Sequence, residues 1–396
     1  MKIGDTLYFD HQATTPVDSQ VFDTMRPYFA ENFGNSHSVD HAVGWRAAQA
    51  VDRATAQVAS MIGSDPDEIT FTSGATEANN LALFGLGRRA ASGPRNRILL
   101  GATEHKCILE IGRILHDVHG YEVAHIPVDA EGRIDPDALD ELLSDDVLIV
   151  SVMAANNEIG TLQDMATLSE TVRQYGAFLH CDAAQAPCAI DLSGMADTVD
   201  MLSLSGHKIY GPMGIGALYI SRDLQSAIEP LIHGGGQQNG LRSGTLPTPL
   251  IVGIGAAAEL VSSESAKAER ATLRQRTEQF ACHLKNMPCP IWFNGPEDPT
   301  LRHPGNINAG FAGVEAADLL GRVQPQLAAS TGSACTSGMT EPSHVLRAIG
   351  LSEQEASSSI RFSLGKGSTE DDVLRAAEIL RSAIEGLADN DLLEIA

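Results

Sequence analysis

One lysine of the sequence lies where a chemically active amine is expected. Residues 201–204 form an apolar run that predicts a buried strand, and this run leads directly into Ser205, His207 and Lys208 before a glycine-rich loop. A lysine held against an apolar strand end loses hydration, which disfavours its ammonium form and frees the amine to attack a carbonyl. Lys208 is therefore a candidate for Schiff-base chemistry, and the alternative is a solvated lysine in a surface loop.

Polar side chains follow three further apolar runs that also predict strands. The runs are 98–101, 147–153 and 177–180, and the side chains that follow them are His105, Asn157 and Asp182. A carboxylate such as Asp182 is costly to bury alone, so it either caps a turn or meets a cation. His105 could stack on a flat ring or have only a structural role. Open α/β sheets bind ligands where the carboxyl ends of their strands meet, so we expect these residues to lie together.

A glycine turn offers an anion site at the same edge of the predicted sheet. In the segment TSGATEANN, a strand over 68–72 is followed by Gly74, Ala75 and Thr76, which predict a tight turn into a helix. The free amides of a helix N-terminus suit a phosphate, although a plain helix cap is the alternative. A phosphate site, a reactive amine and a carboxylate for a ring nitrogen together fit pyridoxal phosphate (PLP).

The elements that must position these residues alternate along the chain. Short apolar runs alternate with helical patterns, among them 19–29 and 43–61, as in a mostly parallel sheet covered by helices. Residues 250–284 predict one or two long helices that lead into a further domain. At 396 residues the chain is long enough for a large domain and a smaller one.

Composition and charge exclude several classes of function. The net charge of −24 argues against direct binding to nucleic acid or to an anionic membrane, because phosphate binding needs clustered Lys and Arg. No apolar run has the character of a signal peptide or a membrane span, so a cytoplasmic protein is expected. The six cysteines form no CxxC pair and are expected to be free thiols, and no metal site is expected.

Several motifs of the chain match one known family. They are FTSGATEANN, TEHK, NNEIG, SGHKIYGPMGIGALY, RSGT, TGSACTS and SSIRFSLG, within a stretch that runs from DHQATTP to SSSIRFSLG. The sequence thereby resembles the cysteine desulfurases of the NifS/IscS type, in the class V aminotransferase family of PLP fold type I. The resemblance implies an α/β fold with a mainly parallel seven-stranded sheet covered by helices, plus a smaller α+β C-terminal domain. The large PLP-binding domain would comprise 16–259, and the small domain 1–15 and 260–396.

The resemblance also implies roles for individual residues. Lys208 would form the Schiff base with the cofactor, Asp182 would pair with its pyridine nitrogen, and His105 would stack on the ring and handle protons. Gln185 and Asn157 would hydrogen-bond the side of the ring hydroxyl and the substrate. The phosphate would be held by Ala75, Thr76, Ser205 and His207, together with Thr245 of the partner subunit, which is why a homodimer is expected.

A cysteine in a stretch of small residues is the candidate nucleophile. The segment AASTGSACTSG, residues 328–338, contains Cys335 and has few side chains that could pack, so we expect a mobile loop with a reachable thiol. Composition alone also allows an incidental loop cysteine, whereas the resemblance makes Cys335 the nucleophile that carries sulfur. Cys107, Cys181 and Cys188 lie in or next to predicted strands and helices and are expected to belong to the core.

Arg361 is the candidate for binding a substrate carboxylate. It stands between apolar residues of SSSIRFSLG, where an unpaired guanidinium would be unfavourable. Its forked donors suit a bidentate carboxylate such as that of an amino acid, and a structural ion pair is the alternative. Asn35, in FGNSHS, is expected to border the pocket, although the family more often has a proline after this asparagine.

These expectations describe an enzyme that converts L-cysteine to L-alanine and leaves the sulfur as a persulfide on Cys335. The sulfur would then pass to an acceptor protein in iron–sulfur assembly, tRNA thiolation or DNA phosphorothioation. One alternative is a selenocysteine lyase or another PLP-dependent aminotransferase-like enzyme. The other is a non-catalytic sulfur-relay scaffold, against which the joint presence of Lys208, Asp182, His105 and Cys335 speaks.

Overall fold

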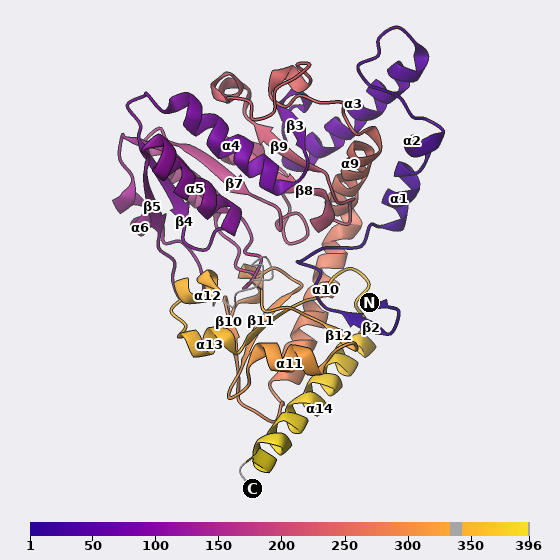
Figure 1. Ribbon diagram of the computed structural model, residues 1–396, viewed down its shortest axis with the longest axis vertical. Helices are drawn as coiled ribbons and strands as arrows, with labels where there is room; N and C mark the ends of the chain where they lie inside the picture. The colour runs from indigo at the N-terminus through magenta and orange to yellow at the C-terminus, as the bar shows by residue number, and fades with distance from the viewer. Residues whose placement is uncertain (333–342, 395–396) are drawn as a thin grey trace.

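A seven-stranded sheet forms the centre of the larger part of the protein, shown in the upper half of Figure 1. The computed structural model describes residues 1–332 and 343–394. The strand order is β3-β9-β8-β7-β6-β4-β5, and the only antiparallel pairs are those that β9 makes with β3 and β8. The strands are β3 (Ile69–Thr72), β4 (Arg97–Gly101), β5 (Glu122–Ile126), β6 (Val147–Met153), β7 (Phe178–Asp182), β8 (Met201–Ser205) and β9 (Gly216–Ile220). The prediction of a mainly parallel seven-stranded sheet is confirmed.

Helices cover both faces of this sheet, as its two apolar faces require. On one face α4 (Ala75–Ala90) and α5 (Lys106–His119) pack together, and the other face carries α3 (Ala42–Ile62), α7 (Met165–Gln174) and α9 (Thr248–Ser262). Neighbouring strand residues belong to opposite faces. Leu202 and Leu204 of β8 lie in the cluster with α3 and α9, whereas Met201 lies in the cluster with α4 and α5.

A second, smaller part lies below the sheet in Figure 1. Its antiparallel sheet has the order β10-β11-β13, and a further small sheet has the order β1-β2-β12. The strands are β1 (Lys2–Ile3), β2 (Thr6–Tyr8), β10 (Ile291–Asn294), β11 (Asn306–Phe311), β12 (Leu327–Ala328) and β13 (Ser359–Ser363). The helices packed there are α10 (Glu264–Leu284), α11 (Ala316–Arg322) and α14 (Glu370–Glu394).

The remaining helices are short. They are α1 (Ser19–Met25), α2 (Pro27–Ala30), α6 (Pro136–Leu142), α8 (Met195–Thr198), α12 (His344–Ala348) and α13 (Glu353–Ser357), with short 3₁₀ helices at η1 (Pro66–Glu68), η2 (Gly206–Lys208), η3 (Arg222–Ala227), η4 (Gln238–Gly240) and η5 (Pro299–Leu301). None of the helices in the described ranges is long and apolar enough to cross a membrane.

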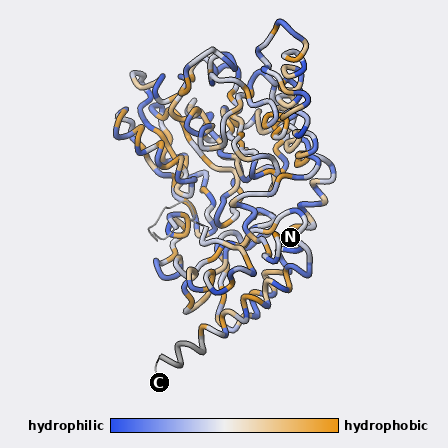
Figure 2. Tube along the Cα trace, turned by 45° about the vertical axis from the view of Figure 1, so that its right-hand side comes forward, coloured by the Kyte–Doolittle hydropathy of each residue, from blue (hydrophilic) through white to orange (hydrophobic). Residues whose placement is uncertain are grey.

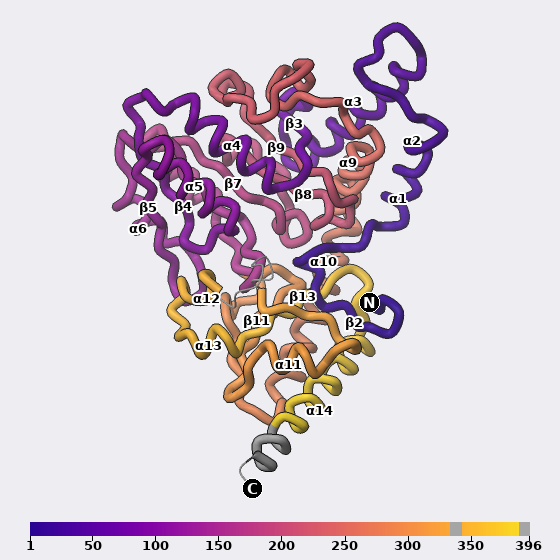
Figure 3. The backbone as a smooth tube through the Cα atoms, viewed as in Figure 1, coloured from indigo at the N-terminus to yellow at the C-terminus, as the bar shows by residue number. Residues whose placement is uncertain are grey.

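The N-terminal segment joins the smaller part of the protein. Leu7 of β2 pairs with Leu327 of β12, and Figure 3 shows this first segment beside the C-terminal elements. Helix α14 buries Val373, Ala376, Leu380 and Ile384, a spacing of three to four residues that places them on one face. Hydrophobic and hydrophilic colours alternate along this helix in Figure 2. The domain boundaries after residues 15 and 259 stay a prediction.

One helical prediction changes in detail, and another is narrowed to one of its two alternatives. The pattern over 19–29 predicted one helix, but α1 ends at Met25 and α2 begins at Pro27, because proline has no N–H for a continuous helix and fits the first turn of a new one. Residues 250–284, which predicted one or two long helices, form two, α9 and α10, which Ser263 separates. Ser263 has an extended backbone, with φ −66° and ψ 157°.

We expect Leu204→Ala to destabilise the strand that leads to Lys208. Leu204 is fully buried, so the truncation leaves a cavity and should lower the free energy of unfolding by about 2–5 kcal/mol, measured by urea titration. The control is Val118→Ala on the exposed surface of α5, which should change the free energy by less than about 0.5 kcal/mol. Equal effects of the two variants would contradict this description of the core.

Candidate functional site

A cavity of about 670 Å³ lies at the carboxyl ends of the parallel strands. Its lining includes most of the residues singled out from the sequence: Ala75, Thr76, His105, Asn157, Asp182, Gln185, Ser205, His207, Lys208 and Arg361. These residues come from the ends of β3, β4, β6, β7 and β8 and from β13 of the smaller part. The structure therefore brings together side chains that are as much as 286 positions apart, from Ala75 to Arg361.

Lys208 projects into this cavity from the turn that follows β8. The turn is the short 3₁₀ helix η2, and its first residue must be small because a Cβ on Gly206 would come within 2.8 Å of the Pro212 carbonyl oxygen. Nζ of Lys208 donates hydrogen bonds to the carbonyl oxygens of Gln12 and Ala13, the second at 2.8 Å. The amine is thus held by main-chain oxygens of the DHQATTP turn.

Asp182 is the last residue of β7 and is almost completely buried. Its Oδ2 accepts a hydrogen bond from Nδ2 of Asn79 at 2.8 Å, and its Oδ1 accepts one from the Ala184 N–H at 3.0 Å. Asn79 was not predicted from the sequence, although it lies in the FTSGATEANN motif. It follows Ala75 by four residues on α4 and so shares a helix face with it, which is the signal that could have identified it. Its buried Oδ1 has no partner among the described residues.

His105 caps the N-terminus of α5 at the end of the β4 loop. Its Nδ1 accepts a hydrogen bond from the Cys107 N–H at 3.2 Å, and the Cys107 thiol lies 3.0 Å from the same nitrogen. Burial lowers the pKa of His105 below its usual value, an effect that the negative charge of Asp182 partly opposes. The imidazole is therefore neutral at neutral pH and can accept a proton.

The cavity also contains a helix N-terminus suited to an anion. Helix α4 begins at Ala75, and the preceding Gly74 has no side chain that could cap the helix. Few residues other than glycine could adopt the φ of 155° that Gly74 has. A Cβ on Gly216 would lie 2.6 Å from the Gly74 backbone, so β9 can approach this turn only because residue 216 is a glycine. Thr76 and Ala75 line the cavity here, and the amides of this first helical turn point to an anion-binding role.

Two more side chains surround this end of the cavity. Nδ1 of His207 lies 3.1 Å from the Thr14 hydroxyl, and burial lowers the pKa of His207 to about 4, with a further contribution from the charge of Lys208. Glu77 pairs with Arg242 at 2.8 Å and accepts a hydrogen bond from the Ser73 N–H at 2.7 Å. Arg242 thereby neutralises a carboxylate that would otherwise repel an anion.

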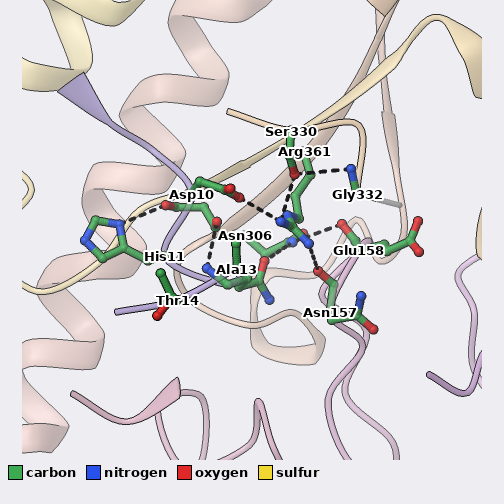
Figure 4. A network of polar contacts seen from close by, with 12 residues as sticks. Asp10, His11, Ala13, Thr14, Asn157, Glu158, Asn306, Ser330, Gly332 and Arg361 are labelled. Carbon is green, nitrogen blue, oxygen red and sulfur yellow. Dashed lines mark hydrogen bonds and ion pairs between the residues drawn. The ribbon is translucent and has the colours of Figure 1, made fainter. Parts of the chain in front are cut away.

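Arg361 lies at the opposite side of the site, on β13 of the smaller part (Figure 4). Its Nη2 donates to Asp10 Oδ1 at 2.7 Å and to Ser330 Oγ at 2.8 Å, and its Nη1 donates to the Asn157 carbonyl oxygen at 2.9 Å. The ion pair that the sequence left open as an alternative is therefore present, with Asp10. Arg361 nevertheless lines the cavity while it is paired with Asp10.

Glu104 is a buried carboxyl group that the sequence did not single out. It is 1 % exposed, and its Oε1 accepts a hydrogen bond from the Met153 N–H at 2.5 Å. Burial, assisted by the charge of Asp182, raises the pKa of Glu104 well above its usual value. This raised pKa favours the neutral form of Glu104, which lessens the repulsion between its carboxyl group and Asp182.

Two of the sequence candidates lie outside the cavity lining, and a third lies outside the described residues. Asn35 is exposed and accepts a hydrogen bond from the His37 N–H at 2.9 Å, and Thr245 is exposed outside the cavity lining. Cys335 lies outside the described residues. The proposed roles of these three residues stay predictions. Gln185 lines the cavity and donates to the Gln12 carbonyl oxygen at 2.9 Å.

The other cysteines near the site are poor nucleophiles. Burial raises the pKa of the Cys107 and Cys188 thiols to about 12 in each case, and it also raises the pKa of the Cys181 thiol well above its usual value. Cys181 is fully buried in the core, while Cys107 and Cys188 pack against core clusters, as expected. In the part of the chain that the structure describes, no group of three or more His, Cys, Asp or Glu residues could hold a metal ion.

Comparisons with known proteins give the family. Residues 7–375 match the model of the class-V aminotransferase family. A cysteine desulfurase IscS of Rickettsia rickettsii (strain Iowa) is 44% identical over 381 residues, which cover 96% of this chain and 92% of the relative. Among solved structures, a NifS-like protein has a TM-score of 0.88 at 32% identity, covering 97% of this chain and 99% of that one. The structure of SspA in complex with cysteine has a TM-score of 0.80 at 36% identity, covering 92% and 100%.

These likenesses extend over nearly the whole chain, and they do not favour the selenocysteine lyase, aminotransferase or scaffold alternatives. They agree with the fold and with the motifs that the cavity brings together. The chain belongs to the class-V aminotransferase family and, within it, to the enzyme family of the cysteine desulfurases.

Proposed function

We propose that the protein is a PLP-dependent cysteine desulfurase that takes sulfur from L-cysteine and hands it to an acceptor protein. The observation that carries this proposal is the joint placement of Lys208, Asp182 and Arg361 around one cavity. The three groups provide an amine for an aldehyde, a carboxylate for a ring nitrogen and a guanidinium for a carboxylate. This set suits the joint binding of PLP and an amino acid.

The residues of the cavity fit PLP in three respects. The uncapped N-terminus of α4 offers amides for the phosphate, and Ser205 and His207 lie nearby in the lining. Asp182 lines the cavity and is held in place by hydrogen bonds from Asn79 and the Ala184 N–H. The orphaned Oδ1 of Asn79 shows that this region has hydrogen-bonding capacity left for a further polar group. Bound PLP would supply an aldehyde for Lys208 and an electron-withdrawing ring.

Substrate binding is assigned to the other side of the cavity. Arg361 would bind the α-carboxylate of L-cysteine, and the Asn157 side chain, which lines the cavity beside it, would help to orient the amino acid. Support comes from the structurally similar SspA, whose structure was solved in complex with cysteine. Asn35 is proposed to border the same site.

Sulfur transfer is assigned to Cys335. Its thiolate attacks the sulfur of the substrate, the S–S bond forms as the C–S bond breaks, and the electron pair of the broken bond stays with the carbon. Protonation of that carbon gives alanine, and Cys335 retains the sulfur as a persulfide. His105, neutral because burial lowers its pKa, is the group proposed to accept and return protons beside Lys208.

The proposal extends to partners. Thr245 is exposed and outside the cavity of its own chain, which is compatible with a role at the phosphate of a second subunit in a homodimer. The proposed acceptor protein serves iron–sulfur assembly, tRNA thiolation or DNA phosphorothioation, all expected in the cytoplasm. With a net charge of −24, the protein would act through a protein acceptor and would not bind nucleic acid or a membrane directly.

The proposed function predicts two products from one reaction. Purified protein loaded with PLP and given L-cysteine should release alanine and carry a persulfide on Cys335, detected by amino-acid analysis and intact mass. Lys208→Ala should abolish both products because it removes the amine, and Cys335→Ala should abolish the persulfide. The control is Cys282→Ala, which removes an exposed thiol outside the cavity and should leave both products unchanged. Alanine release that survives Lys208→Ala would refute the proposed chemistry.

His105 should determine how the reaction responds to acid. Burial lowers the pKa of His105 below 6.5, so the imidazole can still accept a proton in mild acid. Activity should therefore fall only once the pH drops below the lowered pKa of His105. His105→Asn should reduce kcat by about 100-fold or more in a pH–rate profile. The exposed His125 is the matched control, and His125→Asn should behave as wild type. An unchanged rate of persulfide formation in His105→Asn would remove this residue from the mechanism.

A further inference from the structure

Asp10 contacts the proposed carboxylate-binding arginine without lining the cavity itself. Its Oδ1 lies 2.7 Å from Nη2 of Arg361, and the two side chains are 18 % and 4 % exposed, respectively. Arg361 belongs to the cavity lining, whereas Asp10 does not. Among the residues that the structure describes, Asp10 is the only carboxylate in an ion pair with this guanidinium. Arg361 therefore faces the cavity while it is already paired with an internal anion.

The hydrogen bonds of Arg361 leave no complete fork for a second carboxylate. A guanidinium has five N–H donors: one on Nε and two on each terminal nitrogen. Both N–H groups of Nη2 are used, by Asp10 and Ser330, and one of Nη1 is used by the Asn157 carbonyl oxygen. A bidentate carboxylate binds either Nη1 with Nη2 or Nε with Nη2, so both forks need Nη2. Nε is moreover buried without a partner in the described structure.

We propose that Asp10 is an internal competitor for the substrate carboxylate, which sets how tightly Arg361 binds amino acids. This inference rests on the proposed function, in which Arg361 receives the α-carboxylate of L-cysteine. To bind in two-point fashion, that carboxylate must take an Nη2 donor from Asp10 or Ser330. It must also share the single positive charge of Arg361 with Asp10.

The two acceptors on Nη2 differ in what they do to an incoming anion. Ser330 is neutral and can give up its hydrogen bond without leaving a charge, whereas Asp10 repels the α-carboxylate as long as it is ionised. The product alanine carries the same α-carboxylate as cysteine, so Asp10 weakens both. The consequence is moderate substrate affinity together with ready release of the product. Asp10 also keeps Arg361 paired when no amino acid is bound, which a buried guanidinium needs.

The charge of Asp10 can be removed while its hydrogen-bonding oxygen is kept. In Asp10→Asn the amide oxygen can still accept from Nη2, so Arg361 retains its position but loses its internal counter-charge. The PLP-loaded protein should then bind L-alanine about fivefold or more tightly, measured as Kd by calorimetry, and KM for L-cysteine should fall in parallel. Calorimetric binding does not depend on turnover. A merely structural role for Asp10 would instead weaken binding.

The matched control is Asp18→Asn. Asp18 lies in the same N-terminal segment and pairs with Lys366 at 3.1 Å, outside the cavity lining, so this variant makes the same change in net charge without contacting Arg361. Its Kd for L-alanine should equal that of wild type. If Asp10→Asn fails to fold, Asp10→Ser removes the same charge with a smaller side chain, and the same expectation applies.

L-alaninamide separates this inference from the function on which it rests. It lacks the carboxylate, so wild type should bind it more weakly than L-alanine, and Asp10→Asn should improve the binding of L-alanine only. Equal binding of alanine and alaninamide by wild type would refute the role of Arg361 as the carboxylate site. Discrimination by wild type, with an unchanged or weaker alanine Kd in Asp10→Asn, would overturn the role of Asp10 alone.

Discussion

The turn formed by residues 10–13 is the element on which the geometry of the site depends. Its carbonyl oxygens at Gln12 and Ala13 accept hydrogen bonds from the Lys208 amine, and its Asp10 side chain pairs with Arg361. The turn is itself anchored to β13, because the Gln12 N–H donates to the Ser363 hydroxyl at 2.9 Å. One short N-terminal segment thus positions the two cationic groups that serve the proposed cofactor and substrate.

Carboxyl groups near the cavity are paired, hydrogen-bonded or favoured in the neutral form, although the chain carries a net charge of −24. Glu77 is paired with Arg242 and Asp10 with Arg361, and burial raises the pKa of Glu104, which favours its neutral form. Asp182 receives hydrogen bonds from Asn79 and from a backbone amide. An acidic protein can in this way keep a site that accepts a phosphate and a carboxylate, since its nearby carboxylates do not act as free negative charges.

The sequence was informative wherever a strong local pattern carried the information. Short apolar runs predicted the parallel strands, and the rule that ligands bind at their carboxyl ends placed His105, Asp182 and Lys208 together, as the structure does. The seven-stranded sheet and the smaller C-terminal part followed from family motifs. The break between α1 and α2 was missed because the helical pattern was given more weight than Pro27.

Contacts between distant segments could not be predicted in the same way. Nothing local in DHQATTP indicates that Asp10 meets Arg361 or that two carbonyl oxygens hold Lys208, because these contacts join residues separated by 351, 196 and 195 positions. Asn79 and Glu104 were overlooked for a related reason. Their importance comes from complete burial beside Asp182, and burial of a polar residue does not follow from its type.

The central claim is that the cavity holds PLP through Lys208. The most direct measurement is borohydride reduction of the PLP-loaded protein, which fixes a Schiff base as a stable secondary amine, followed by peptide mapping with mass spectrometry. The account predicts a phosphopyridoxyl group on the peptide that contains Lys208, and its loss in Lys208→Arg. A label on Lys106 or Lys366 instead, or no label on a protein that still binds PLP, would contradict it.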